Sequence, residues 1–322
     1  MPRFAIALVL LLCACAAPPL RPAPAGSSRE ATATPRRGTE ISICGELFDI
    51  GTPVVLWYDE GGYSAYHAAP FFGASGKSGL RYKPGRADPN PAPFGRAEPA
   101  ALTLEHVRAR VDQFVLHFDV CGTSRECFRV LQDARVLSVH FLLDADGAIY
   151  QTLDLADTAW HARQANPRSV GVEIAQIGCY RVGKAAILDQ WYPRDEQGPY
   201  LKLPERLAKF PFRDAAYTAR PERPERIRGA IHGAEYEQHD YTARQNEALA
   251  KLVGGVARAL PRIRLDYPRG ADGAVLDRAL DDAEFRAFSG VLGHWHVTED
   301  KVDPGPALDF ERLIERARTP TN

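Results

Sequence analysis

The sequence predicts an α/β fold in which one mixed central β-sheet is flanked by helices. Short apolar runs of strand length alternate along the chain with longer segments whose apolar residues recur at helical spacing. Strands interleaved with helices in this way are typical of domains built on a single sheet. The chain has 322 residues, of which 45% are hydrophobic, so it can bury one large core or two smaller ones.

The N-terminal region is expected to lie outside the folded domain. Residues 1–15 combine a short basic start, an apolar run and small residues, which is typical of a secretory signal. The end of this segment, Leu12 to Cys15, resembles a bacterial lipobox in which Cys15 would carry lipid; an ordinary signal peptide is the alternative. Residues 16–39 are rich in Pro, Ala, Ser and Arg, which predicts a tether.

These features predict where the protein resides. A lipidated Cys15 would anchor it to a membrane surface without a spanning helix. Ala16 resembles the residue that directs lipoproteins to the outer membrane, so we expect an exported, periplasmic lipoprotein on the outer membrane of a Gram-negative bacterium. No later window approaches the roughly 20 apolar residues that span a bilayer. A net charge of −1 argues against nucleic acid as a partner.

The folded part divides into an N-terminal extension, residues 40–110, packed on a larger domain, residues 111–318. Pro, Arg, Lys and Tyr dominate about 178–228 and predict an insertion that crosses the surface. Apolar and β-branched runs predict strands at 53–58, 114–118, 136–143, 148–153 and 169–176, with a turn at 144–147. Apolar residues at helical spacing, behind capping residues, predict helices at about 125–134, 242–260, 281–288 and 306–318.

Four cysteines lie beyond the lipobox: Cys44, Cys121, Cys127 and Cys179. An even number in an exported chain favours disulfides, of which three pairings are possible. Cys121 and Cys127 are close enough in sequence to close one loop, which would leave Cys44 for Cys179. Four reduced, buried thiols are the alternative. Because no CxxC occurs, a zinc site made only of cysteines is not expected.

Candidate metal ligands gather in the stretch 290–305. His294 and His296 are followed by Asp300 and Asp303, and the stretch ends in Pro-Gly. Imidazole nitrogen and carboxylate oxygen are ordinary zinc ligands, and a catalytic zinc usually takes three protein ligands and a water. We expect one histidine and one aspartate of this stretch to bind the metal.

The third ligand must come from elsewhere in the chain. His117 is the candidate, because it stands near the end of the apolar strand predicted at 114–118 and can point into a cleft from a rigid base. Together with one histidine and one aspartate of 290–305, it predicts a zinc hydrolase.

The order of six short motifs identifies a family that the chain resembles. It is similar to the zinc-dependent N-acetylmuramoyl-L-alanine amidases, the amidase-2 family, which are related to peptidoglycan recognition proteins. The motifs that carry the resemblance are FVLHF at 114–118, SVHFLLDADGAIYQ at 138–151, AWHA at 159–162, SVGVEI at 169–174, GH at 293–294 and KVDPGPALDF at 301–310.

The resemblance implies a role for each residue that matches a family position. His117, His294 and Asp303 match the ligands of Zn²⁺, with His296 and Asp300 as competing candidates. Glu173 matches an acidic residue near the metal and Lys301 a lysine used in catalysis. In this reading Glu173 takes the proton of the attacking water, and Lys301 helps to hold the oxyanion.

Further roles follow from the same resemblance. Trp160, His161 and Asn166, on the loop before the strand at 169–174, are expected to line the cleft for sugar or peptide; a core position is the alternative for Trp160. Cys121 and Cys127 match a disulfide of the recognition proteins. His140 is expected to pack in the interior.

The implied reaction is hydrolysis of the amide between the lactyl group of N-acetylmuramic acid and L-alanine of the stem peptide. Peptidoglycan or muropeptides are the expected substrates, and the membrane is reached through the lipid anchor. A peptidoglycan-binding lipoprotein without catalysis and a structural lipoprotein with a zinc-stabilised fold are the alternatives. The sequence does not predict an oligomeric state.

Overall fold

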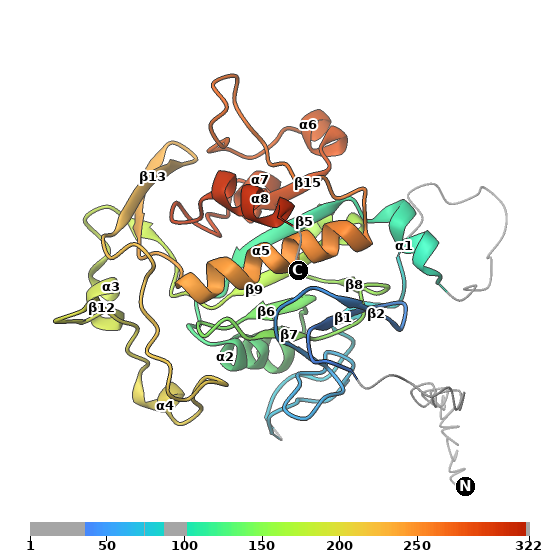
Figure 1. Cartoon of the computed structure of the whole chain (residues 1–322), viewed down its shortest axis with the longest axis horizontal. Helices are drawn as coiled ribbons and strands as arrows, with labels where there is room; N and C mark the ends of the chain where they lie inside the picture. The colour runs from blue at the N-terminus through green and yellow to red at the C-terminus, as the bar shows by residue number, and fades with distance from the viewer. Residues whose placement is uncertain (1–35, 74, 87–101, 320–322) are drawn as a thin grey trace, which may run out of the picture. The chain divides into compact units, whose positions relative to one another are not determined.

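The computed structural model describes residues 36–73, 75–86 and 102–319. The secretory signal, Cys15 and most of the tether therefore lie outside the described residues. The described residues form one compact unit (Figure 1). Arg36 belongs to it, because its guanidinium pairs with Asp59 and donates to the carbonyl of Glu40. The folded part thus begins a few residues before the predicted end of the tether at 39.

A six-stranded mixed sheet forms the centre of this unit, as predicted (Figure 1). Its strands, in spatial order, are β15 (Gly290–Gly293), β5 (Gln113–Phe118), β9 (Ser169–Ile174), β6 (Phe141–Leu143), β7 (Ile149–Gln151) and β3 (Val54–Leu56). Neighbours from β15 to β6 pair in parallel, β6 and β7 are antiparallel, and β7 and β3 are parallel. The carboxyl ends of β15, β5 and β9 therefore meet at one edge.

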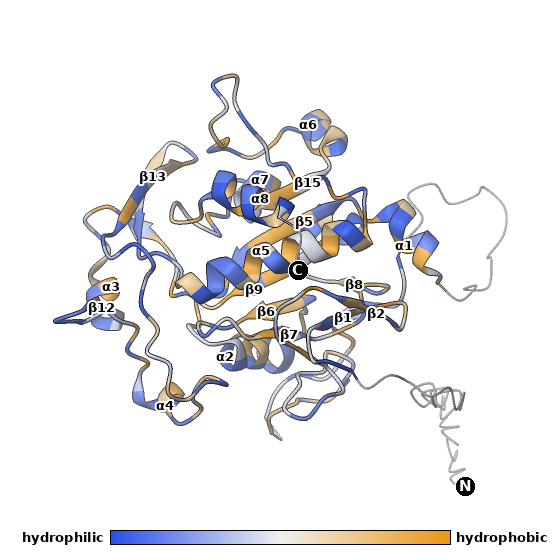
Figure 2. Ribbon diagram, viewed as in Figure 1, coloured by the Kyte–Doolittle hydropathy of each residue, from blue (hydrophilic) through white to orange (hydrophobic). Residues whose placement is uncertain are grey.

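Alternation along the strands separates two faces of the sheet. Phe114 and Leu116 of β5 join the main core, which also contains apolar residues of the helices α5 (Ala243–Ala259) and α8 (Phe310–Arg318). Val115 points to the other face, where it packs in a smaller cluster with Leu292. In Figure 2 the central strands are largely orange, whereas the two helices carry both blue and orange residues. His117 and Glu173 follow the same alternation and share the face opposite α5.

Capping side chains set the starts of several helices. Thr242 caps α5 by accepting from the backbone N–H of Gln245, and Asp281 caps α6 (Asp282–Ala287) in the same way, so both helices lie within the ranges predicted for them. Thr123 caps α2 (Ser124–Arg129). Asp309 caps α8, which therefore begins four residues later than the predicted start at 306.

The predicted strand at 136–143 is mostly wrong, because only Phe141–Leu143 is extended in the sheet. After α2 the chain continues as a π-helical turn, Val130–Arg135, and Val136 then takes a left-handed conformation with φ 58°. Residues 136–140 are therefore loop, and the strand begins at Phe141 instead of Val136.

The N-terminal extension is built into the sheet rather than only packed against it. Its strand β3 is an edge strand, and β1 (Glu40–Ile43) forms a hairpin with β2 (Glu46–Asp49). Ile41 and Ile43 are fully buried in the main core. The extension also supplies β4 (Tyr82–Lys83), which pairs with β8 (Thr158–Ala159), and α1 (Leu104–Arg110).

The stretch 178–228 forms short elements that do not join the central sheet. These are β10 (Tyr180–Arg181), α3 (Ala186–Trp191), β11 (Arg194–Asp195), β12 (Gly198–Pro199) and α4 (Glu205–Ala208). It runs into the hairpin of β13 (Ile227–Ile231) and β14 (Ala234–Gln238), and β10 completes that small sheet. Leu188, Trp191 and Leu207 form its own apolar cluster. Among the described residues, no helix has the length and apolar character needed to cross a bilayer.

A buried carboxyl in the turn between β6 and β7 gives a prediction about pH. Burial and the negative charge of Asp146 raise the pKa of Asp144 from 3.8 to about 8. Since the folded-state pKa lies above the unfolded one, the contribution of Asp144 to stability is present at low pH and is lost as pH rises toward 8. We compare the free energy of unfolding of Asp144→Asn with that of the native chain. We expect this difference to shift in favour of Asp144→Asn by at least about 1 kcal/mol as the pH rises from about 5.5 to about 8.

Urea unfolding of both chains at the two pH values, in otherwise identical buffer, measures this change. The two proteins differ only at residue 144, so the pH dependence contributed by every other titratable group cancels in the difference. A stability difference that stays the same at both pH values would contradict the prediction.

Candidate metal centre

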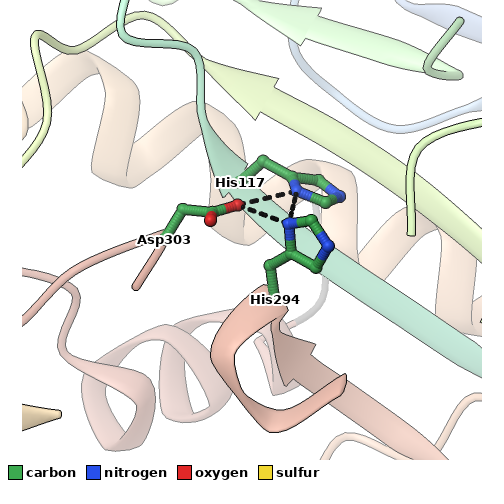
Figure 3. A group of neighbouring side chains, drawn as sticks. All are labelled: His117, His294 and Asp303. Atoms are coloured by element: carbon green, nitrogen blue, oxygen red, sulfur yellow. Dashed lines mark hydrogen bonds and ion pairs between the residues drawn. The ribbon is translucent and has the colours of Figure 1, made fainter. Parts of the chain in front are cut away.

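Three side chains from separate parts of the chain converge at the carboxyl edge of β5 and β15. His117 lies on β5, one residue before its end, and His294 directly follows β15 as the first residue of α7 (His294–Val297). Asp303 lies on the loop between α7 and α8. Figure 3 shows the carboxylate facing both imidazole rings.

The three nearest atoms form a small triangle. Asp303 Oδ2 lies 2.8 Å from His117 Nδ1 and 2.9 Å from His294 Nδ1, and the two nitrogens are 3.0 Å apart. All three residues are buried. Within the described residues this is the only group of three or more His, Cys, Asp or Glu side chains arranged to hold a metal ion. Two imidazole nitrogens and one carboxylate oxygen are a donor set that suits zinc.

Burial also sets the charge of these groups. It lowers the pKa of His117 to about 4, with a smaller contribution from His294, so that the ring is neutral and can offer a lone pair. Burial alone would raise the pKa of Asp303, but hydrogen bonds with the two histidines outweigh it and hold that pKa below its usual range. Asp303 is therefore a carboxylate.

The loop that carries Asp303 is fixed from β14 and the segment after it. The carbonyl of Pro304 accepts hydrogen bonds from Tyr241 Oη at 2.7 Å and from Gln238 Nε2 at 3.2 Å. Gly305 has φ 80°, and a Cβ there would lie 2.1 Å from Gln238 Oε1. The Asp-Pro-Gly turn thus needs glycine at its last position for both conformation and space.

The two alternative ligands lie away from this triangle. His296 Nδ1 accepts from the N–H of Gly293 at 2.9 Å, and its Nε2 lies 2.8 Å from the carbonyl of Leu276. Both of its nitrogens are therefore occupied. Asp300 is exposed and pairs with Arg163 at 2.6 Å. Neither side chain is placed to replace His294 or Asp303.

Glu173 occupies the neighbouring position on the same face. It lies on β9, where its Cα is the register partner of His117. Its Oε2 atom is buried and has no hydrogen-bond partner among the described residues. Burial, together with the charge of Asp303, raises its pKa well above the usual value. A carboxylate of this kind can accept a proton beside the metal position.

Lys301 lies two residues before Asp303, on the same loop and half-buried. Its charge is close enough to lower the pKa of both Glu173 and His117, in each case as a minor contribution. The carbonyl of Lys301 lies 2.9 Å from Nε2 of His232, at the tip of the β13–β14 hairpin. The hairpin therefore supports the loop that carries the lysine.

The residues expected to line the cleft fall into two groups. The Trp160 side chain is half-buried and lies outside the apolar clusters. Its backbone N–H donates to Ser138 Oγ. Asn166 Oδ1 instead accepts from the N–H groups of His161 and Ala162, so its amide shapes the loop. His161 contacts His117 Nε2 through Nδ1 and Ser169 Oγ through Nε2. Neither ring nitrogen of His161 is free for a substrate, a placement that the sequence motif did not indicate.

All four described cysteines are free thiols. Cys121 and Cys127 are neighbours, since the Cys121 side chain hydrogen-bonds with that of Cys127 and helps burial to raise its pKa. A Cys121–Cys127 disulfide therefore remains a prediction.

Comparison with known proteins gives the class. Residues 107–306 match the Amidase_2 family, described as N-acetylmuramoyl-L-alanine amidase. The chain therefore belongs to this family of amidases, enzymes that act on peptidoglycan. No curated protein matches it.

Several solved structures are similar to this one. A selenomethionine derivative of AmpD has 16% sequence identity and a TM-score of 0.33, covering 65% of this chain and 86% of that one. AmiD from E. coli, in complex with anhydro-N-acetylmuramic acid-L-Ala-D-gamma-Glu-L-Lys, has 15% identity and a TM-score of 0.35, covering 69% and 60%. LysC from Clostridium intestinale URNW has 12% identity and a TM-score of 0.33, covering 65% and 87%.

The ligand set can be tested by metal content. We expect His294→Ala to lose bound zinc, because it removes one corner of the triangle. His296→Ala should keep zinc and lose about 1–3 kcal/mol of stability, because the N–H of Gly293 and the carbonyl of Leu276 lose their partner.

Elemental analysis of the dialysed proteins, with urea unfolding alongside, measures both effects. Zinc that remains in His294→Ala while His296→Ala loses it would contradict the assignment.

Proposed function

We propose that this amidase is zinc-dependent and hydrolyses the bond between the lactyl group of N-acetylmuramic acid and L-alanine. One observation supports it above the others. The buried triangle of His117, His294 and Asp303 lies beside Glu173, whose carboxylate has an oxygen without a hydrogen-bond partner. Metal donors and a proton acceptor therefore share one face of the sheet.

His117, His294 and Asp303 would hold the ion and leave its fourth position open. When bound, zinc supplies Lewis acidity, which polarises a carbonyl and makes hydroxide available at a pH of about 7. The two neutral imidazoles and single carboxylate preserve a net positive charge at the site. That charge favours a carbonyl oxygen as it becomes negative.

Glu173 and Lys301 act on the reacting groups. Glu173 accepts a proton from water as the water oxygen attacks the carbonyl carbon of the amide. It then gives that proton to the amide nitrogen as the carbon–nitrogen bond breaks, so that the stem peptide leaves as a free amine. The ammonium group of Lys301 stabilises the negative oxygen of the tetrahedral intermediate.

The place of action follows from the N-terminal sequence. A lipidated Cys15 would hold the protein at the outer membrane, and the Pro- and Ala-rich tether that follows it would let the folded unit reach peptidoglycan in the periplasm. Labelling with a radioactive fatty acid, lost in Cys15→Ser, tests this part separately from the chemistry.

The reaction is tested by mass spectrometry of purified muropeptides after incubation with the full chain. We expect N-acetylmuramic acid and a stem peptide with a free L-alanine amino group to appear together. A chelator should abolish both products, and added zinc should restore them. Intact sacculi and soluble anhydro-muropeptides, assayed in parallel, identify the preferred form. Binding of muropeptides without any cleavage would refute the proposal and favour the non-catalytic alternative.

The assigned roles separate metal binding from turnover. Glu173→Gln should keep its zinc and lower kcat by about 10²- to 10⁴-fold, because the amide cannot accept the proton. Lys301→Ala should also keep zinc and lower kcat by about 10²- to 10³-fold. Glu46→Gln, a change of an exposed glutamate on β2, is the matched control and should leave kcat unchanged.

Zinc content and steady-state rates of the three variants measure these effects. A Glu173→Gln protein with native kcat would contradict the proposed proton transfer.

A further inference from the structure

A histidine outside the metal triangle lies directly behind one of its ligands. His161 Nδ1 is 2.9 Å from His117 Nε2, and the two rings are nearly perpendicular, at 85°. On its other side, His161 Nε2 is 3.2 Å from Ser169 Oγ. The ring thus bridges the metal ligand and the first residue of β9.

The direction of the hydrogen bonds follows from the metal position. If His117 offers the Nδ1 lone pair to a metal, its ring proton must be on Nε2. That N–H then needs an acceptor, which is Nδ1 of His161. The proton of His161 is consequently on Nε2 and is donated to Ser169 Oγ. Each contact has one donor and one acceptor, and His161 holds His117 in the tautomer that can bind the ion.

The position of His161 is itself tightly defined. A Cβ on Gly171 would lie 2.5 Å from Nδ1 and Cε1 of His161, so the ring occupies the space that the missing side chain leaves. The backbone N–H of His161 donates to Asn166 Oδ1 at 3.1 Å. Gly171 thus leaves room for the ring where it meets His117, and Asn166 holds the backbone that carries the ring.

A buried arginine holds the segment that carries these groups. Arg86 donates through Nη1 to the carbonyls of Ser169 at 2.8 Å and Asn166 at 3.2 Å, and through Nε and Nη2 to that of Leu155 at 3.0 and 2.8 Å. It is only 5% exposed. Ser169 and Asn166 both contact His161 through their side chains. Arg86 precedes the residues 107–306 that match the family, so the N-terminal extension contributes it.

We infer that His161 is a positioning residue for the metal ligand His117, and that Arg86 of the N-terminal extension acts on the metal centre through His161. The inference rests on the metal site of the proposed function. It assigns the extension a part in metal binding rather than a purely architectural one.

Zinc affinity of the full chain, measured by competition with a chromophoric chelator, tests the role of His161. His161→Leu removes the acceptor for His117 Nε2 and should weaken zinc binding by about 10- to 100-fold. His161→Asn keeps an oxygen acceptor close to the position of Nδ1 and should restore most of the affinity. His239→Leu, which removes another buried imidazole away from the triangle, is the control and should bind zinc as the native chain does.

Two outcomes separate this inference from the proposed function. A native chain that binds no zinc would refute the proposed function itself. A native chain and a His161→Leu chain that bind zinc equally well would refute only the positioning role. The visible spectrum of the cobalt-substituted proteins gives a second readout, because a displaced His117 changes the ligand field, whereas a merely structural loss does not.

A second variant covers the case in which His161→Leu does not fold. Gly171→Ala removes no hydrogen-bonding group but places a methyl group against the His161 ring, and it should lower zinc affinity in the same direction. Native affinity in a folded Gly171→Ala protein would count against the inference.

The part of Arg86 is tested by a double-mutant cycle. Arg86→Met should weaken zinc binding about 10-fold in the native chain and have no further effect in His161→Leu. Additive effects would show that Arg86 does not act through His161. If Arg86→Met does not fold, Arg86→Lys replaces it, since lysine keeps the charge but cannot reach all three carbonyls at once.

Discussion

The register between β15 and β5 is the constraint on which the metal centre depends. Gly293 is the Cα partner of Leu116, so the next residues along the two parallel strands are His294 and His117. The two ligands are therefore neighbours by backbone pairing before any side chain is considered. A slip of one residue would turn His117 toward the apolar core. The burial of Phe114, Leu116 and Val291 on that core face opposes such a slip.

The same register explains how polar groups can be buried here. β9 pairs on the other side of β5 and brings Glu173 level with His117. Burying an isolated charge or an unpaired imidazole costs several kcal/mol, so these groups are stable only as a set. The carboxylate of Asp303 satisfies two imidazoles, and His161 satisfies the far side of one of them. A bound cation would offset the negative charge of the carboxylates.

The sequence predicts the elements whose signals are local. Thr242 and the apolar stripe after it define α5, and the ordered motifs bring His117, His294 and Asp303 together even though the chain separates them widely. Prediction from the sequence fails where contacts between distant parts of the chain determine the local conformation. Nothing local shows that Val136 turns left-handed. The role of His161 is hidden too, because the partners of its ring nitrogens lie on the strands β5 and β9.

Arg86 shows that residues outside the range matched by the family also contribute to the metal centre. Burial lowers the pKa of its guanidinium to about 10, a sign of how strongly water is excluded around it. Such a group is tolerated only where its N–H donors find acceptors, and here they find three carbonyls between Leu155 and Ser169. That segment carries His161. The desolvation cost of the arginine is thus tied to the shape of one loop, and that loop determines how His117 faces the metal position. An extension that also supplies the edge strand β3 is therefore part of the catalytic domain in a physical sense.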